Sequence, residues 1–272
     1  MRLFDPSVWH ANLTSSLIAI ETAKQREHYL PDAVGNAAVL GLQTCVYAYL
    51  VGLDHEVEPL IRKYRNWLED SLIRNEQFGS PPCYFAALRY EALALVDWLC
   101  ENRLEQVLHE QALLQYQRTW QEIGGSSGLG VEKIREHYAA DFLRNCVLGR
   151  AYARGVAFWE QLGGRCPQDA SDIMEEAEMG YWLCRQSWGP STRDAKALEA
   201  AARVFTLRLE SDWLVGGQAL RTAAWLQAVY WESAVAHTPK DTLSKAYEFM
   251  PHVAWRYREL TSGQTESLGS DL

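Results

Sequence analysis

The stretch "DASDIMEEAE", residues 169–178, holds the densest group of carboxylates in the chain that could do chemistry. In a helix, Asp169, Asp172 and Glu176 would share one face at spacings of three and four residues, with Glu175 beside them. Carboxylates on facing helices can bind divalent metal ions, but such sites need a second matching cluster. The sequence has no DDxxD and no Glu-x-x-His motif to supply one. We therefore expect neither a bound metal nor a cofactor.

Without a metal, the acidic stretch has two interpretations. Acidic residues are favoured in the first turn of a helix by its dipole, so the cluster could simply stabilise the start of a helix. Alternatively, an exposed row of carboxylates could contact a basic protein, with aromatic residues further along the helix as anchors. On this second hypothesis the candidate partner-binding residues are Asp169, Asp172, Glu175, Glu176, Trp182 and Trp188.

The glycine-rich stretch "GGSSGLG", residues 124–130, raises the question of a phosphate-binding loop. A Walker loop needs Lys followed by Ser or Thr after its last glycine, whereas Val131 and Glu132 follow Gly130 here. The dinucleotide pattern GxGxxG is also missing, and the preceding segment has helical periodicity. We therefore interpret 124–130 as a connector on the surface, without a bound nucleotide.

The remaining reactive residue types are scattered. The seven histidines form no HExxH motif and no zinc-ligand spacing, and there is no GxSxG nucleophile motif. The six cysteines include no CxxC pair, which favours reduced residues in a core. The sequence therefore predicts no catalytic residues and a protein that is not an enzyme.

Apolar residues recur with helical periodicity almost throughout, as they do at Val57, Ile61, Tyr64, Leu68 and Leu72. No window alternates with a period of two for long enough to predict a sheet. The sequence thus predicts an all-α fold with about nine or ten helices. The helices expected after the first span residues 32–51, 55–75, 84–101, 103–123, 131–162, 169–187, 192–214, 217–237 and 240–260.

The organisation follows from these elements. We expect an N-terminal helical half over 1–123, the connector 124–130, a C-terminal helical half over 131–261 and a disordered tail over 262–272, together forming one compact unit. Weak repeats at offsets of 47 and 45 residues are typical of stacked helical hairpins. A solenoid-like stack and an irregular bundle both agree with these repeats.

Charge narrows the class of partner. The net charge is −9 and the isoelectric point is near 5.3, which argues against binding to nucleic acid or to an anionic membrane. No stretch has the length and apolarity of a membrane span, and the N-terminal residues lack the pattern of a signal peptide. We therefore expect a cytoplasmic protein, with any partner being basic.

The acidic "DASDIMEEAE" helix and the aromatic "WLQAVYWES" helix, within an acidic and Trp-rich helical chain, resemble the helical immunity proteins of bacterial polymorphic-toxin and type VI secretion systems. The resemblance implies a non-catalytic function, in which the protein neutralises a cognate toxin or effector by forming a stoichiometric complex. Two alternatives stay open: a helical-repeat adaptor or chaperone for a secreted effector, and a helical enzyme that depends on a metal or cofactor.

Overall fold

The described part of the chain consists almost entirely of α-helices. In this computed structural model the described residues are 6–26, 30–50, 54–77, 84–103, 105–123, 129–163, 172–188, 200–201, 203–204 and 219–231, and none of them is in a strand. The helices are α1 (Pro6–Gln25), α2 (Pro31–Leu50), α3 (Asp54–Gln77), α4 (Tyr84–Glu101), α5 (Gln106–Ile123), α6 (Leu129–Leu148), α7 (Tyr152–Gln161), α8 (Asp172–Trp188) and α10 (Ala219–Trp231). The all-α prediction is confirmed.

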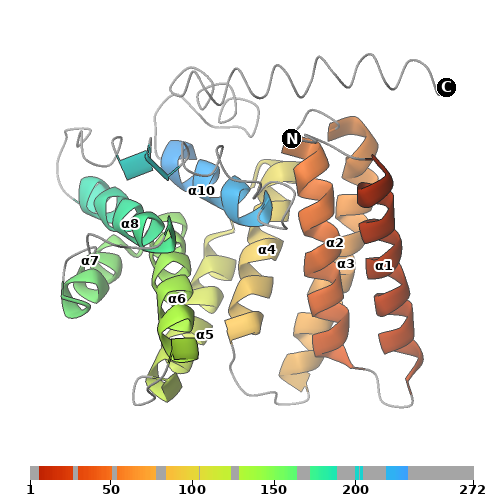
Figure 1. Ribbon diagram of the computed structural model, residues 1–272, viewed down its shortest axis with the longest axis horizontal. Helices are drawn as coiled ribbons and strands as arrows, with labels where there is room; N and C mark the ends of the chain where they lie inside the picture. Colours follow the sequence, from red (N-terminus) through yellow and green to blue (C-terminus); the bar gives the residue numbers. More distant parts are fainter. Residues whose placement is uncertain are drawn as a thin grey trace.

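Helices α1 to α5 pack mainly against their neighbours in sequence (Figure 1). The pattern changes after α6, because α8 packs across α6 and α7. Helix α10 crosses one end of the array and contacts α2, α4 and α6 together. The fold is therefore a row of antiparallel helices with a crossing helix, which joins elements far apart in the sequence.

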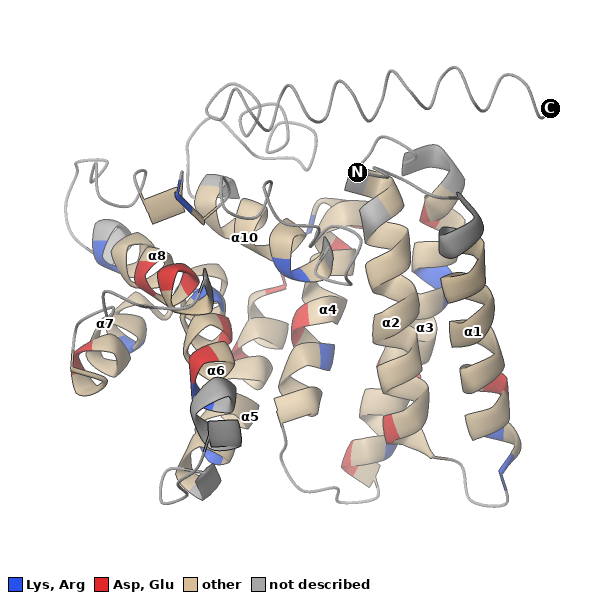
Figure 2. Cartoon of the chain, in the orientation of Figure 1, with Lys and Arg blue, Asp and Glu red and all other residues tan. Residues whose placement is uncertain are grey.

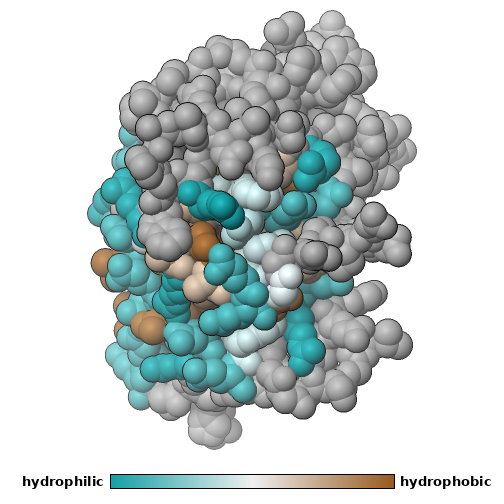
Figure 3. Space-filling model, turned by 90° about the vertical axis from the view of Figure 1, so that its left-hand side faces the viewer, coloured by the Kyte–Doolittle hydropathy of each residue, from teal (hydrophilic) through white to brown (hydrophobic). Residues whose placement is uncertain are grey.

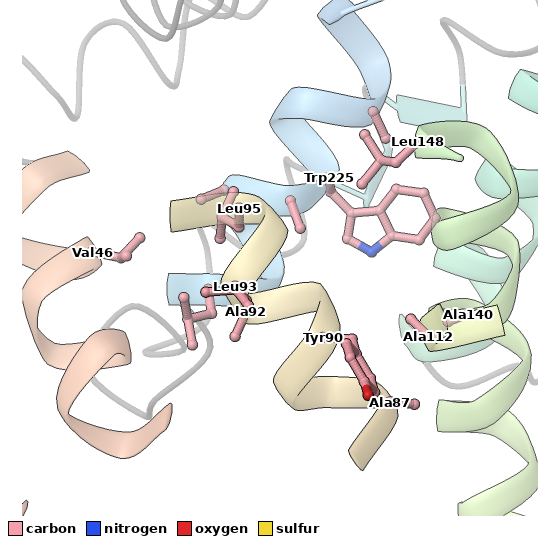
Figure 4. Close-up of a cluster of buried hydrophobic side chains, with 14 of the residues drawn as sticks. Val46, Ala87, Tyr90, Ala92, Leu93, Leu95, Ala112, Ala140, Leu148 and Trp225 are labelled. Carbon is pink, nitrogen blue, oxygen red and sulfur yellow. The ribbon is translucent and has the colours of Figure 1, made fainter. Parts of the chain in front are cut away.

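Helix α4 is the centre of this arrangement. Its apolar residues cover every side of the helix. Every residue from Ala86 to Leu99 is buried except Leu88, which is half-buried. A helix that is apolar all round is stable only when it is surrounded. Figure 4 shows α4 between α2 on one side and α6 on the other, with Trp225 of α10 pointing towards α6. Because α4 has no free face, its few charged residues must find partners inside the molecule.

Helix α4 ends at Glu101 as predicted, and the chain turns at Asn102 before α5, which begins at Gln106 instead of at residue 103. Asn102 takes a left-handed conformation with φ of 52°, which asparagine tolerates better than most residues. Its amide donates to Trp98 O at 2.9 Å, and the Arg103 amide donates to Asp97 O at 3.4 Å. These bonds satisfy carbonyl groups that the helix end would otherwise leave unpaired.

The single helix expected over 131–162 is wrong, because the chain turns at 149–151 and forms α6 and α7 instead. Arg150 has φ of 56°, which ends α6. Gly149 allows the turn to pass close to α5, since a Cβ there would lie 2.9 Å from Asn145 O and 3.1 Å from the Cβ of His109. The break therefore depends on a contact with a helix 40 residues earlier, which local periodicity does not reveal.

Several expectations lie outside the described residues. They are residues 124–128 of the connector, most of the helix expected over 192–214, the helix expected over 240–260, and the tail 262–272. Residues 129 and 130, assigned to the connector, belong to the first turn of α6. Among the described helices, none has the length and hydropathy required to span a membrane.

Candidate functional site

A pocket of about 200 Å³ opens where α10 crosses α2, α4 and α6. Its apolar walls come from α2, α4 and α10, and its polar side comes mainly from α4, α6 and α10. Pockets with a few convergent polar groups among apolar walls are typical of small-molecule sites. The lining residues are Val39, Gln43, Tyr84, Leu88, Glu91, Ala92, Leu95, Asp141, Arg144, Leu220, Arg221 and Ala224.

The polar side is built around Arg144 on α6, whose side chain is only 2% exposed. Its Nε donates to Glu91 Oε1 on α4, and its Nη2 donates to Asp141 Oδ1 at 2.8 Å. The Tyr84 hydroxyl, from the start of α4, donates to Asp141 Oδ2. These bonds fix α4 against α6 through charged groups that are removed from water.

Arg221 extends the cluster from α10. Its Nη2 forms an ion pair with Asp141 Oδ1 at 3.2 Å, and its Nε donates to Glu176 Oε2 on α8 at 2.7 Å. The Nη1 atom donates to His137 Nδ1 at 3.0 Å. Trp225, one turn further along α10, donates its indole N–H to the same Glu176 oxygen at 2.7 Å. Figure 2 shows the acidic residues of α4, α6 and α8 and the basic residue of α10. We call Glu91, Asp141, Arg144, Glu176 and Arg221 the charged cluster.

Burial and pairing move the pKa values of this region away from neutral pH. Burial alone would raise the pKa of Asp141, but the charges of Arg221 and Arg144, with the hydrogen bond from Tyr84, lower it overall. The pKa of Tyr84 is raised, first by burial and then by the Asp141 charge. Burial alone would lower the pKa of Arg144, but the charges of Glu91 and Asp141 raise it overall. Near pH 7 this part of the cluster therefore consists of fixed charges and a neutral phenol.

Two guanidinium nitrogens of residues that line the pocket are themselves buried, with almost no accessible surface of their own. Arg144 Nη1 is buried and makes no hydrogen bond to a described residue. Arg221 Nη2 also makes no hydrogen bond to the described part of the chain, although it lies 3.2 Å from Asp141 Oδ1. We treat this second contact as an ion pair without hydrogen-bond geometry. A buried donor that lacks an acceptor lowers the stability of the folded chain.

The acidic stretch predicted as a partner-binding surface is only partly placed at the surface. Glu176 is fully buried between α6, α8 and α10, so its assignment to that surface is wrong. Glu175 and Trp182 are half-buried, and Trp182 donates its indole N–H to Glu178 Oε1 at 3.2 Å. Asp169 and the side chains of Asp172 and Trp188 lie outside the described residues.

Sequence spacing does not bring together Glu91, Asp141, Arg144 and Arg221, because they lie far apart in the chain. A signal exists nonetheless: Arg89, Glu91 and Asp97 interrupt the otherwise apolar "FAALRYEALALVDWLC". Charged residues are almost never fully buried unless they are paired. An isolated charge inside a helix that is apolar all round therefore indicates an ion pair with a distant element.

Comparison of the chain with protein family models, with curated proteins and with solved structures finds no match. Within the described ranges, no three His, Cys, Asp or Glu side chains are grouped so as to hold a metal ion.

Proposed function

We propose that this protein is an immunity protein that neutralises a basic bacterial toxin by forming a stoichiometric complex. The observation that carries the proposal is the charged cluster, which ties α4, α6, α8 and α10 together through paired buried charges. General acid–base catalysis is most effective when the pKa of the catalytic group lies near the working pH. The pKa of Asp141 is lowered and the pKa of Arg144 is raised, both away from neutral pH, which favours a structural role in a rigid binding scaffold.

Rigidity matters for binding because a preorganised surface loses little conformational entropy when a complex forms. The cluster fixes α8 on α6 and α10, so the outer side of α8 is presented on a firm support. That side carries the half-buried Glu175, Glu178 and Trp182. A tryptophan flanked by carboxylates is suited to a basic partner, since aromatic residues anchor interfaces and complementary charge accelerates association.

The surface around α8 agrees with a polar interface. Figure 3 shows that the described part of the face carrying α7 and α8 is mostly hydrophilic, with small separate hydrophobic areas. Glu178 also contacts Arg203, whose Nη2 lies 3.4 Å from its Oε2. The Arg203 guanidinium compensates part of the Glu178 charge, so the hydrophilic surface and the net charge of −9 are what favour recognition of a basic surface over burial of a large apolar one.

The test is a binding titration against the product of the neighbouring gene, together with a toxicity assay in cells that express both proteins. We expect a one-to-one complex and protection from toxicity. In the double variant Glu175→Lys and Glu178→Lys, association should slow about tenfold or more at low salt and approach the wild-type rate at high salt. Unchanged association at both salt concentrations would remove α8 from the interface.

A matched control is available on other helices. Glu21 on α1 and Glu110 on α5 are exposed, so Glu21→Lys with Glu110→Lys makes the same change in net charge away from α8. The control should slow association much less than the α8 variant. Binding to no neighbouring product, with full toxicity retained, would refute the immunity function.

A further inference from the structure

We propose that Cys146 on α6 and Cys184 on α8 are the site of a disulfide that forms under oxidising conditions and fixes the two helices together. Both cysteines are free thiols here, and both are fully buried. Helix α8 packs on α6 and on α7 (Figure 1). The proposal does not depend on toxin neutralisation, because it concerns only thiols of this chain and a small oxidant.

Gly155 on α7 shows how close the two cysteines lie. A Cβ on Gly155 would be 2.6 Å from Cys184 Sγ, 3.4 Å from Cys184 Cβ and 3.0 Å from Cys146 Cβ. The three atoms therefore surround one point, which only a glycine leaves open. Because a disulfide joins Cβ atoms about 3.5–4.5 Å apart, the two cysteines reach bonding distance with a combined shift of no more than about 3 Å.

A contact of the Cys184 thiol gives the same placement independently. Its Sγ donates weakly to Leu143 O at 3.9 Å, and Leu143 lies three residues before Cys146 on α6. The two helices also approach closely one turn earlier on α8, where a Cβ on Gly180 would be 2.8 Å from Leu143 Cβ. Residues three apart share a helix face, so Cys184 lies against the side of α6 that carries Cys146.

The reaction needs an oxidant, and a small-molecule disulfide is the class that serves here. The thiolate of one cysteine attacks this disulfide, forms a mixed disulfide and releases one small thiolate. The thiolate of the other cysteine then attacks the protein sulfur of the mixed disulfide and releases the second small thiolate. The two protons of the cysteine thiols end on the released thiolates, so each protein disulfide is accompanied by two small thiols.

Burial determines when this reaction can occur. Burial raises the pKa of the Cys146 thiol and of the Cys184 thiol, so almost no thiolate is present near pH 7 while α8 stays on α6. The oxidant reaches the sulfurs only when α8 separates locally from α6, as cooperative units of a folded protein do. The disulfide therefore forms after α8 has opened, and it retains the closed arrangement once α8 has returned.

The experiment treats the full chain with hydroxyethyl disulfide, blocks the remaining thiols, and cleaves the unfolded product with trypsin and a glutamate-specific protease. Cleavage after Glu178 separates Cys184 from Cys166, so mass spectrometry assigns the linkage. We expect a peptide pair joining Cys146 to Cys184, formed at least about tenfold faster in urea below the unfolding midpoint, because opening limits the reaction. Mixed disulfides without this pair, a link from either residue to another cysteine, or thiols that stay reduced throughout would overturn the proposal.

Two variants connect the linkage to stability. Cys146→Ala removes one partner, whereas Cys100→Ala changes a half-buried cysteine on α4 and is the matched control. After oxidation, wild type and Cys100→Ala should melt about 5 °C or more above their reduced forms, and a reducing agent should reverse the shift. Cys146→Ala should show no such increase, and an equal increase there would contradict the assigned pair. If Cys146→Ala does not fold, the peptide linkage in the wild-type chain still decides the question.

Discussion

Glu176 and Trp225 are fully buried, and a hydrogen bond of 2.7 Å from the indole Nε1 to the carboxylate Oε2 joins them across 49 residues of sequence. Arg221 Nε donates to the same oxygen at 2.7 Å. One carboxylate on α8 thus satisfies two donors from successive turns of α10. The connection between these helices depends on an acid that the sequence suggested was a surface residue.

We predict that Glu176→Ala destabilises the protein by about 3 kcal/mol, because it leaves the Arg221 charge and the Trp225 N–H without their shared acceptor. Urea unfolding followed by tryptophan fluorescence measures the change. Glu110→Ala removes an exposed carboxylate from α5 and should alter the free energy of unfolding by less than about 0.5 kcal/mol. Similar losses in the two variants would contradict the assigned role of Glu176.

A second prediction concerns the packing of α2 on α3. A Cβ on Gly41 would overlap the ring of Tyr64, which is fully buried. Gly41→Ala should therefore lower the free energy of unfolding by about 1–3 kcal/mol, despite the better helix propensity of alanine. Leu40→Ala, at an exposed neighbouring position, is the control and should change stability little. A Gly41→Ala variant more stable than wild type would show that the helices can separate without cost.

The dependence of stability on pH should reveal the buried His109. Burial lowers its pKa, a hydrogen bond between its Nδ1 and Asn145 Oδ1 at 2.8 Å opposes the shift, and Glu91 and Arg144 act in opposite directions nearby. A lowered folded-state pKa means that the stabilisation is present above about pH 6.5 and is lost as pH falls below it. Between pH 7.5 and 5.5 the free energy of unfolding should fall, by at most about 1.4 kcal/mol per pH unit from this group.

Replacing the imidazole isolates this contribution. His109→Gln keeps a donor for Asn145 and removes the titrating ring, so its stability should vary less over the same pH range. Guanidinium unfolding at several pH values gives both slopes. Parallel slopes for wild type and variant would assign the pH dependence to other groups.

The turn after α4 provides a further test. Asn102 has positive φ and an exposed side chain, so its main contribution is conformational. Asn102→Ala should destabilise the protein by about 1 kcal/mol, whereas Asn102→Gly should be close to neutral, because glycine takes this conformation without strain. Thermal melting of the pair decides the matter: equal melting temperatures would mean that the turn changes its conformation.

Sequence patterns within a few residues predicted those features of the fold that neighbouring residues determine. On α3 the apolar stripe from Val57 through Tyr64 to Leu72 is buried as its spacing requires, and the turn at Asn102 follows from a residue type suited to positive φ. These features depend on residues within a turn or two of one another.

The charged cluster depends on contacts between residues far apart in the sequence, which a local pattern does not reveal. Glu91 and Arg144 are 53 residues apart, and Arg221 meets Glu176 across 45 residues. Glu91 stands in an apolar helix and indicates a distant partner without identifying it, and only the packing of α4, α6, α8 and α10 makes the pairs. The prediction of a partner-binding surface failed at Glu176 for the same reason. Residue spacing places Glu176 on one face of a helix but does not say what covers that face.

The crossing position of α10 also determines when the contacts of the charged cluster can be completed during synthesis. The ribosome releases α2, α4, α6 and α8 before α10, so for a time Glu176 has neither Arg221 nor Trp225, and the pocket lacks the wall formed by Leu220 and Ala224. In a nascent chain that ends before residue 219, the Glu176 carboxylate lacks both of these donors and must be hydrated. The contacts between α8 and α10 therefore form only after α10 has been synthesised. A premature stop codon before residue 219 would release a chain that lacks these contacts.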